Sequence, residues 1–273
     1  MNKEEYLISK FKSNKIGDDG AVLGDLVYSK DLFCEDIHFK LSWMNLRQIA
    51  IKSMLINISD AIAMNARPKQ ALIGLVIPSN FSLSQIKELS LGFMEVTSKY
   101  GIEIIGGDTT AGTKLMISIT IISHTKKPIY RTNLKNGDFI AYTGHIGESK
   151  KGLTKLLRGG KLNSKSRFIT PTLKADFFYE ASKYVNAALD ISDGLSKDLS
   201  RICKSSGYIG VNFLKKFTKQ ELCSGEEYEM LFSFAPKNLA KIKSLAKKHR
   251  TSLNIFARAK KGQYKSTCKE NHF

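Results

Sequence analysis

The segment from Asn45 to Ala66 constrains the fold of this chain more than any other, because it reads as a helix with apolar groups over most of its surface. Its apolar positions recur at helical spacing and are Leu46, Ile49, Ala50, Met54, Leu55, Ile58, Ala61 and Ile62. A helix of this kind is stable only where other elements cover it on several sides. The sequence therefore predicts a deeply packed helix.

The polar exceptions in that helix fall on one narrow stripe. Ser53, Asn57 and Asp60 stand at positions i, i+4 and i+7, which share a helix face. A carboxylate in such apolar surroundings costs free energy unless it is paired or bound to a metal. Two interpretations of Asp60 remain open: a buried side chain held by hydrogen bonds, or a ligand that faces a site.

The rest of the chain alternates between strand and helix patterns. A β-hairpin is expected over 21–39 with its turn at Gly24-Asp25. Further strands are expected at 71–77, 115–123, 139–143, 187–191, 208–213, 228–234 and 253–256. Further helices are expected at 3–12, 82–100, 149–157, 173–184, 195–205 and 238–249. This order predicts an α/β (α+β) fold of two mixed α/β domains, residues 1–136 and residues 137–273.

The stretch Ile104-Ile105-Gly106-Gly107-Asp108-Thr109-Thr110 combines an apolar run, two glycines and a carboxylate. We expect a strand that the glycines break into a loop, which would bring Asp108 to the strand end. Either the loop is an ordinary turn with a satisfied carboxylate, or Asp108 is a metal or phosphate ligand. The stretch 188–194, ALDISDG, repeats the pattern with Asp190 and Asp193.

Carboxylates recur at turns, at strand ends and on the polar stripe, at Asp18, Asp19, Asp31, Asp60, Asp108, Asp190 and Asp193. If they converge, their repulsion requires cations, and Mg²⁺ is the cation that commonly bridges carboxylates to substrate phosphates. The sequence contains no GxxxxGK[ST], GxGxxG, HExxH or GxSxG motif. We therefore expect a nucleotide held mainly through metal ions and a phosphoryl-transfer reaction.

Composition excludes several other classes. No apolar run reaches the roughly 18 residues of a membrane span, and the N-terminus lacks a signal peptide, so a cytoplasmic, soluble protein is expected. Cys34, Cys203, Cys223 and Cys268 lie far apart, which predicts reduced thiols. The net charge of +18 is spread along the chain without a nucleic-acid-binding motif, so nucleic acid is not the expected partner.

Seven motifs together resemble thiamine-monophosphate kinase and occur in that family's order. They are IGDDGAVL (16–23), SKDLFCEDIHF (29–39), KSMLINISDAIAMNA (52–66), IIGGDTT (104–110), YTGHIGESKKGL (142–153), ALDISDGLSKDL (188–199) and SGEEYEMLF (224–232). Single motifs recur in the wider superfamily of aminoimidazole ribonucleotide synthetase and selenophosphate synthetase. The set covers residues 16 to about 234.

The resemblance implies Mg²⁺-assisted phosphorylation of thiamine monophosphate by ATP, with direct transfer of the γ-phosphoryl group and no protein nucleophile. It also implies an N-terminal domain that binds ATP and Mg²⁺ and forms a homodimer, with the C-terminal domain beside the active-site cleft. By motif match the metal ligands are Asp19, Ser29, Asp31, Asp60, Asp108, Asp190 and Asp193. The matched ATP contacts are Gly107, Asp108, Arg131 and Ser192, and the matched thiamine contacts are His38 and Glu226.

Four features of the sequence depart from the family's pattern. Lys30 replaces a Thr beside Asp31, the sequence 224–227 reads SGEE instead of Gly-Gly-Glu-Asp, and Lys174 replaces an Arg. The short tail keeps the final His-Phe but lacks the aromatic residue expected before it, for which Tyr264 is a possible substitute. Two other functions stay open: another ATP-using enzyme of the superfamily, such as a selenophosphate synthetase, and a basic nucleic-acid-binding protein. The first relies on a Cys or selenocysteine ahead of the first acid motif, and no Cys precedes Cys34.

Overall fold

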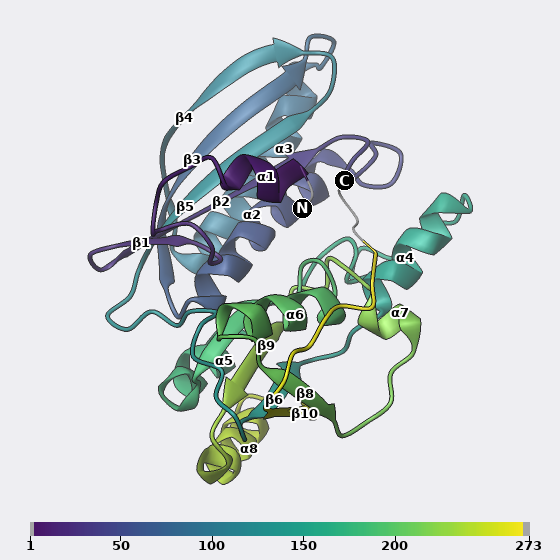
Figure 1. The fold of residues 1–273 in the computed structure, drawn as a ribbon. Helices are drawn as coiled ribbons and strands as arrows, with labels where there is room; N and C mark the ends of the chain where they lie inside the picture. The colour runs from purple at the N-terminus through teal and green to yellow at the C-terminus, as the bar shows by residue number, and fades with distance from the viewer. Residues whose placement is uncertain (1–2, 270–273) are drawn as a thin grey trace.

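Two five-stranded sheets, one from each half of the chain, form the framework of the protein in a computed structural model that describes residues 3–269 (Figure 1). The first sheet has the order β1-β2-β5-β3-β4 and contains β1 (Ala21–Leu23), β2 (Leu26–Cys34), β3 (Arg67–Pro78), β4 (Glu103–Gly112) and β5 (Met116–His124). The second has the order β7-β9-β6-β10-β8 and contains β6 (Phe139–Thr143), β7 (Ala187–Asp190), β8 (Gly210–Phe213), β9 (Met230–Phe234) and β10 (Leu253–Lys260).

The helices alternate with these strands, so the expected mixed α/β fold is confirmed. They are α1 (Lys3–Ile8), α2 (Leu46–Ala63), α3 (Leu83–Tyr100), α4 (Glu148–Leu157), α5 (Ala175–Ala181), α6 (Leu195–Ser205), α7 (Lys219–Leu222) and α8 (Leu239–Lys248), with short 3-10 turns at η1 (Ser182–Tyr184) and η2 (Pro236–Asn238). The connection between β5 and β6 contains the boundary expected between residues 136 and 137. We propose that each sheet is the centre of one domain.

Helix α2 lies between the two halves, as its apolar surface predicts (Figure 1). It begins with a capping box in which the Asn45 side chain accepts from the Gln48 N–H and the Gln48 side chain accepts from the Asn45 N–H. One side packs on β2, β3 and β5, and another contacts α5 and β7 of the second half. Since both halves cover it, thirteen of its eighteen residues are buried.

Strand β4 overturns the prediction of a loop at the two glycines. The strand runs without a break from Glu103 to Gly112 and pairs in parallel with β3. Gly107 has φ of 153°, and a Cβ there would lie 1.8 Å from the carbonyl oxygen of Ile73. The glycine is therefore required by the close approach of two strands rather than by a turn.

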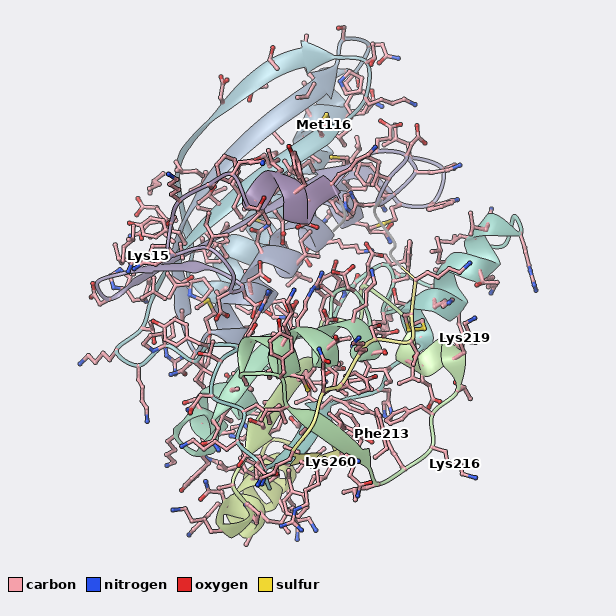
Figure 2. All side chains as sticks on the ribbon, in the orientation of Figure 1. Lys15, Met116, Phe213, Lys216, Lys219 and Lys260 are labelled. Carbon is pink, nitrogen blue, oxygen red and sulfur yellow. A yellow bond between two sulfur atoms is a disulfide. The ribbon has the colours of Figure 1, made fainter. Side chains whose placement is uncertain are left out.

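The first sheet is covered on one face only. Along β5 the buried residues Ile117, Ile119 and Ile121 face α2, while the alternate residues point the other way. On that other face Leu32 is 53% exposed, and Met116, which is labelled in Figure 2, is 38% exposed. This face therefore carries exposed apolar side chains, which are typical of an interaction surface.

A disulfide joins Cys223 to Cys268, so the prediction of reduced thiols is wrong for these two residues. Their Cα atoms are 5.6 Å apart although 45 residues separate them in sequence. The spacing of the cysteines in the sequence gave no sign of this disulfide, because the two residues meet only where the chain segment after β10 runs back past α6 to reach α7 (Figure 1). Cys34 and Cys203 are free and buried, as expected for ordinary thiols.

Candidate active site

Three carboxylates meet where the two halves of the chain join. Asp19 comes from the turn before β1, Asp60 from α2 and Asp190 from the end of β7, and one oxygen of each lies within 4.8 Å of the others. The hydroxyl of Ser59 donates to Asp190 at 2.6 Å. We call Asp19, Asp60 and Asp190 the acid cluster.

Burial and mutual repulsion act on the protonation of these acids. Burial, then the charge of Asp19, raises the pKa of Asp31 to about 6 although a hydrogen bond from Asp60 opposes the change. Burial and the neighbouring carboxylates raise the pKa of Asp60 and of Asp190 well above the ordinary range. Such repulsion is what a bound divalent cation relieves, because it favours the charged form of every carboxylate around it.

Two buried oxygen atoms beside the cluster have no hydrogen-bond donor in the described chain: Oδ2 of Asp19 and Oδ1 of Asn57. Ser29 lies close by, since its hydroxyl donates to the backbone oxygen of Asn57 at 3.2 Å. Hard oxygen atoms without donors, next to crowded carboxylates, fit the ligand preference of Mg²⁺. The residues present therefore suit the metal that the resemblance implies.

Arg131 is the cation that this structure places against the acids. Its guanidinium donates to Asp19 at 2.5 Å, and its backbone N–H donates to Asp18 at 3.0 Å. Burial raises the pKa of Asp18 to about 6, with Asp19 adding to the effect. Arg131 therefore offsets part of the negative charge of these acids.

Asp193 follows β7 but its carboxylate faces helix α6. It lies 2.6 Å from the guanidinium of Arg201 and 3.8 Å from Nζ of Lys197. Its backbone N–H donates to Asp198 at 3.1 Å. The turn after β7 thus carries a second carboxylate that is already paired with cations of the same half.

Asp108 stands apart from the acid cluster within one chain. It is exposed on β4, and its Oδ1 accepts from the N–H of Thr109 at 2.9 Å. The sheet order places β4 three strands from β2, which corresponds to about 14 Å between Asp108 and Asp31. Asp108 and Asp31 of one chain therefore do not bind the same cation.

The substitution of Lys for Thr at position 30 leaves the acid side of the sheet unchanged. Ser29 and Asp31 point toward α2, whereas the Lys30 ammonium on the opposite face donates to Ser118 at 2.6 Å. A side chain at this position does not reach the acid cluster.

Of the two residues matched to thiamine contacts, Glu226 pairs with a buried lysine and His38 lies beside an aromatic ring that the same lysine contacts. Nζ of Lys52 lies 3.0 Å from Oε2 of Glu226, and Lys52 is completely buried. The same ammonium stands over the ring of Phe33 at 5.6 Å from its centroid, and that ring lies 5.5 Å from His38. Lys52 precedes Asp60 by eight residues on α2, which separates their Cα atoms by about 12 Å.

Backbone conformation and a disulfide fix the Glu226 loop. Glu226 and Tyr228 adopt positive φ of 56° and 51°, which non-glycine residues rarely adopt. The N–H of Glu226 donates to the backbone oxygen of Ser192 at 2.7 Å, and Cys223 anchors the other end through its disulfide. The loop is therefore held against the turn after β7.

Sequence reasoning missed Lys52, although a signal was available. Lys52 stands at i, i+4 and i+8 with Ile56 and Asp60, so it lies on the same side of the helix as the acid and carries the opposite charge. It also missed the buried group of Arg167, Glu227 and Glu229, in which the guanidinium lies 2.7 Å from Glu229. That group forms only when distant segments meet, so no spacing in the sequence reveals it.

The expected aromatic substitute in the tail is engaged elsewhere. The ring of Tyr264 packs against Phe213 at 5.8 Å, and its hydroxyl lies 2.9 Å from that of Ser196. The final His272 and Phe273 lie outside the described residues.

Comparison with known proteins decides the family. The model of AIR synthase related protein, N-terminal domain, matches residues 17–124. A thiamine-monophosphate kinase of Buchnera aphidicola subsp. Schizaphis graminum is 31% identical over 287 residues, which cover 91% of this chain and 88% of that protein. A thiamine-monophosphate kinase of Nitrosopumilus maritimus is 31% identical over 272 residues, which cover 92% of this chain and 83% of that protein. The chain belongs to the thiamine-monophosphate kinase family.

Solved structures agree with this membership. A structure described as AaThiL complexed with AMPPCP and TMP is 25% identical, with a TM-score of 0.86 over 99% of this chain and 96% of that one. The thiamine monophosphate kinase of Aquifex aeolicus shares the fold with a TM-score of 0.85 at 23% identity, over 98% of this chain and 97% of that one. The hydrogenase maturation protein HypE shares the fold with a TM-score of 0.71 at 14% identity, over 95% of this chain and 88% of that one. The family fold thus extends over nearly the whole chain.

Proposed function

We propose that this chain is a thiamine-phosphate kinase, which transfers the γ-phosphoryl group of ATP to thiamine monophosphate and forms thiamine diphosphate. The acid cluster at the junction of the two halves is the observation that carries the proposal. Family membership supports the choice of reaction, and so does the related structure described with AMPPCP and TMP. The enzyme is then a phosphotransferase with a phosphate group as acceptor.

The proposed metal ligands are Asp19, Ser29, Asp31, Asp60, Asp108, Asp190 and Asp193. The orphaned oxygen of Asp19 and the crowding of Asp60 and Asp190 support this assignment. Bound Mg²⁺ would neutralise phosphate charge and align the γ-phosphoryl group for in-line attack. Asp108 lies too far from Asp31 to share an ion with it, so its role calls for a second ion, in keeping with the several ions that the resemblance implies.

The chain's own residues would hold both substrates. Arg131 and the backbone near Gly107 and Ser192 are proposed to contact ATP. At the other end of α2, Glu226 and His38 are proposed to contact thiamine, whose thiazolium ring is cationic and therefore complements a carboxylate. The distance of about 12 Å along α2 between Lys52 and Asp60 suits a substrate whose ring and phosphate lie at opposite ends.

No protein base is needed for this transfer. The acceptor is a phosphate oxygen of thiamine monophosphate, which is already ionised at neutral pH and acts directly as the nucleophile. The residues therefore act by orienting the acceptor oxygen and by excluding water from the γ-phosphoryl group. We propose no covalent phospho-enzyme.

We further propose a homodimer that forms through the uncovered face of the first sheet. The exposed apolar side chains Leu32, Leu72 and Met116 support this, because a self-complementary apolar face is the usual basis of a two-fold dimer. Sedimentation velocity would measure it. Leu32→Asp is expected to shift the protein toward monomer, and an unchanged dimer would contradict the interface.

We propose the cytoplasm as the location. Among residues 3–269 no helix is both long enough and apolar enough to cross a membrane. A disulfide is rare in that compartment, so the Cys223–Cys268 pair would be present there only in part. Trapping of free thiols in intact cells, followed by mass spectrometry, would measure the fraction.

The deciding experiment incubates the purified protein with ATP, Mg²⁺ and thiamine monophosphate and separates the products by chromatography. Thiamine diphosphate should appear in step with ADP, and only with Mg²⁺. Replacement of thiamine monophosphate by selenide tests the alternative of a selenophosphate synthetase. Absence of thiamine diphosphate from a folded preparation that binds Mg-ATP would refute the proposal.

A further inference from the structure

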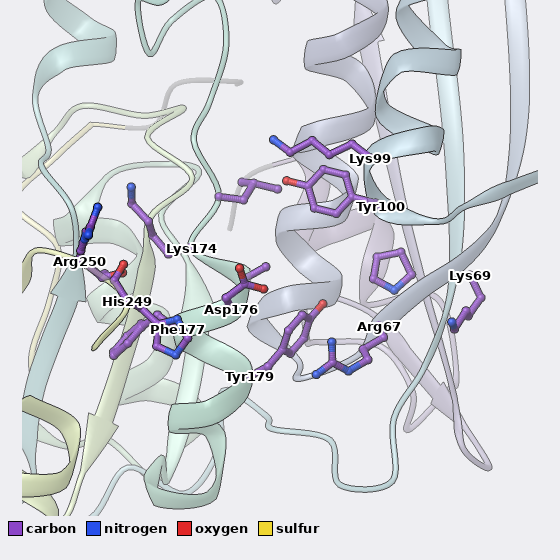
Figure 3. Close-up of a pocket in the computed structure, with 14 residues that line it drawn as sticks. Arg67, Lys69, Lys99, Tyr100, Lys174, Asp176, Phe177, Tyr179, His249 and Arg250 are labelled. Atoms are coloured by element: carbon purple, nitrogen blue, oxygen red, sulfur yellow. The ribbon is translucent and has the colours of Figure 1, made fainter. Parts of the chain in front are cut away.

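A basic cleft lies between the two halves of the chain, away from the acid cluster (Figure 3). Its volume is about 590 Å³. One wall comes from the start of β3 and the end of α3, and the other from α5 and the turn after α8. No residue of the acid cluster, and none of the other proposed ATP, metal or thiamine contacts, lines it.

The cleft has an excess of positive charge. Its permanently charged cations are Arg67, Lys69, Lys99, Lys174 and Arg250. Asp176 is the one carboxylate among its lining residues, so five positive charges and one negative charge leave +4. His249 also lines the cleft and is not counted, because its Nε2 lies 3.2 Å from a carboxylate oxygen of Glu180.

These five cations have no carboxylate partner within 4.0 Å anywhere in residues 3–269. Outside the cleft, four arginines of residues 3–269 are paired with a carboxylate: Arg47 with Glu95, Arg131 with Asp19, Arg167 with Glu229 and Arg201 with Asp198. In the cleft the guanidinium of Arg67 instead stands over the ring of Tyr179, 4.2 Å from its centroid. Unpaired like charges around a concave surface raise its potential and attract anions.

The walls also supply fixed polar and aromatic groups. The hydroxyl of Tyr179 donates to the backbone oxygen of Ala66 at 2.8 Å, which holds its ring in place across the junction of the halves. Tyr100 presents a ring and a hydroxyl beside Lys99 (Figure 3). Phosphate groups suit such a surface, because Arg offers paired donors and Lys a compact charge.

We propose that this cleft binds a small molecule that carries two or more phosphate groups. Lys99 projects from the first half, and Lys174 and Arg250 project from the second (Figure 3). A ligand with at least two phosphates reaches cations on both walls, so its binding links the two halves. The site differs from the acid cluster in one testable respect: its cations bind phosphate without a metal ion.

Isothermal titration calorimetry with inorganic tripolyphosphate in excess EDTA tests the proposal on the full chain. We expect saturable binding of one tripolyphosphate per chain. Lys99→Gln/Lys174→Gln/Arg250→Gln should weaken it at least tenfold, and Lys174→Gln alone should weaken it measurably if the triple variant does not fold.

Two controls separate the cleft from general electrostatics and from the acid cluster. Lys87→Gln/Lys216→Gln/Lys243→Gln removes the same charge from exposed positions outside the cleft, and Asp60→Asn alters the acid cluster. Both should leave the affinity within twofold of that of the unmodified chain. ATP and thiamine diphosphate, titrated under the same conditions, distinguish a nucleotide from another phosphorylated ligand.

Three results would overturn the inference: no saturable heat, equal weakening by the exposed-lysine control, or loss of binding in Asp60→Asn. Binding of an RNA oligonucleotide that is lost in the cleft variant, without any binding of tripolyphosphate, would replace it with a nucleic-acid surface.

Discussion

Replacement of Lys52 by methionine tests how α2 is joined to the Glu226 loop. Methionine has a similar length and no charge, so Lys52→Met removes the ammonium and keeps most of the packing. In the structure that ammonium lies 3.0 Å from Glu226 and 4.1 Å from the centroid of the Phe168 ring. Lys52 has no exposure, whereas the Glu226 side chain is 24% exposed.

The expected change in the free energy of unfolding of Lys52→Met follows from these contacts. A hydrogen bond between charged groups contributes about 1.5–3 kcal/mol, and loss of one partner of a fully buried pair costs about 3–5 kcal/mol. Because water reaches Glu226, the range for a hydrogen bond between charged groups applies rather than the range for a fully buried pair. The substitution also removes the free-energy cost of burying the lysine charge. We expect Lys52→Met to lower the free energy of unfolding by about 1–3 kcal/mol.

A double-mutant cycle with Glu226→Gln isolates the pair, because the separate desolvation costs largely cancel. Urea unfolding of the four proteins should give a coupling free energy of about 1.5–3 kcal/mol. Ser53→Ala is the matched control: Ser53 is the next residue of α2, equally buried, and its hydroxyl donates only to the backbone of Ala50. It should not couple to Glu226→Gln.

Kinetics of the same variants test the proposed thiamine contact. Lys52→Met should raise KM for thiamine monophosphate about tenfold and leave KM for ATP nearly unchanged, since it releases Glu226 and not the acid cluster. A coupling below about 0.5 kcal/mol would show that the ion pair is not formed in solution. A normal KM together with strong coupling would remove Glu226 from the thiamine site and leave it a structural role.

Four further outcomes are expected. Asp108→Asn should reduce turnover about a hundredfold or more with an unchanged melting temperature, because the side chain is exposed and touches no core; near-normal turnover would contradict its assignment as a ligand. Reduction of the Cys223–Cys268 disulfide should lower the free energy of unfolding by up to about 4 kcal/mol in urea titrations, whereas a Cys223→Ser variant should not respond to the reductant. Burial raises the pKa of Glu229 from 4.5 to about 7, so the stability that its protonation gives the folded state is full below pH 4.5 and is lost as pH rises through 7. Glu229→Gln should therefore flatten the fall in melting temperature between pH 4.5 and 7. Mg²⁺ should raise the melting temperature and EDTA should reverse the gain, an effect that Asp60→Asn should abolish.

Much of the fold could be predicted from sequence because local patterns dominate there. The spacing of apolar residues located α2 and α3, and in the structure Asn45 and Ser82 cap these two helices. The predicted strand over 139–143 and the predicted helix over 195–205 match β6 and α6 at both ends. The apolar patterns of these elements are strong, so tertiary contacts did not change their boundaries.

The secondary-structure predictions that were wrong lie where contacts with distant segments override the local sequence pattern. Gly106 and Gly107 read as a strand end, yet pairing with β3 and the close approach of Ile73 keep the strand continuous. The strand predicted at 253–256 continues to Lys260 because β8 pairs with its second half. Neither partner can be identified from the segment itself.

Some residues of the candidate site could likewise be predicted from local sequence, and others could not. Residue type and position at a strand end or on a helix face indicated Asp19, Asp60 and Asp190, and the structure brings these three together. The distance of Asp108 from them depends on strand order, which the sequence does not specify. The pairing of Lys52 with Glu226 joins residues 174 apart in sequence, so it became visible only in three dimensions.

The burial of α2 by both halves has a consequence for how this protein can be divided. One continuous apolar cluster extends from Phe33 and Ile58 of the first half to Phe178 and Phe232 of the second. A fragment ending near residue 136 would leave the second-half side of α2 open to water, and the complementary fragment would lack the helix that covers β7. Each half is thus an incomplete module, and exchange or recombination of halves between relatives would succeed only where the residues facing α2 are exchanged with them.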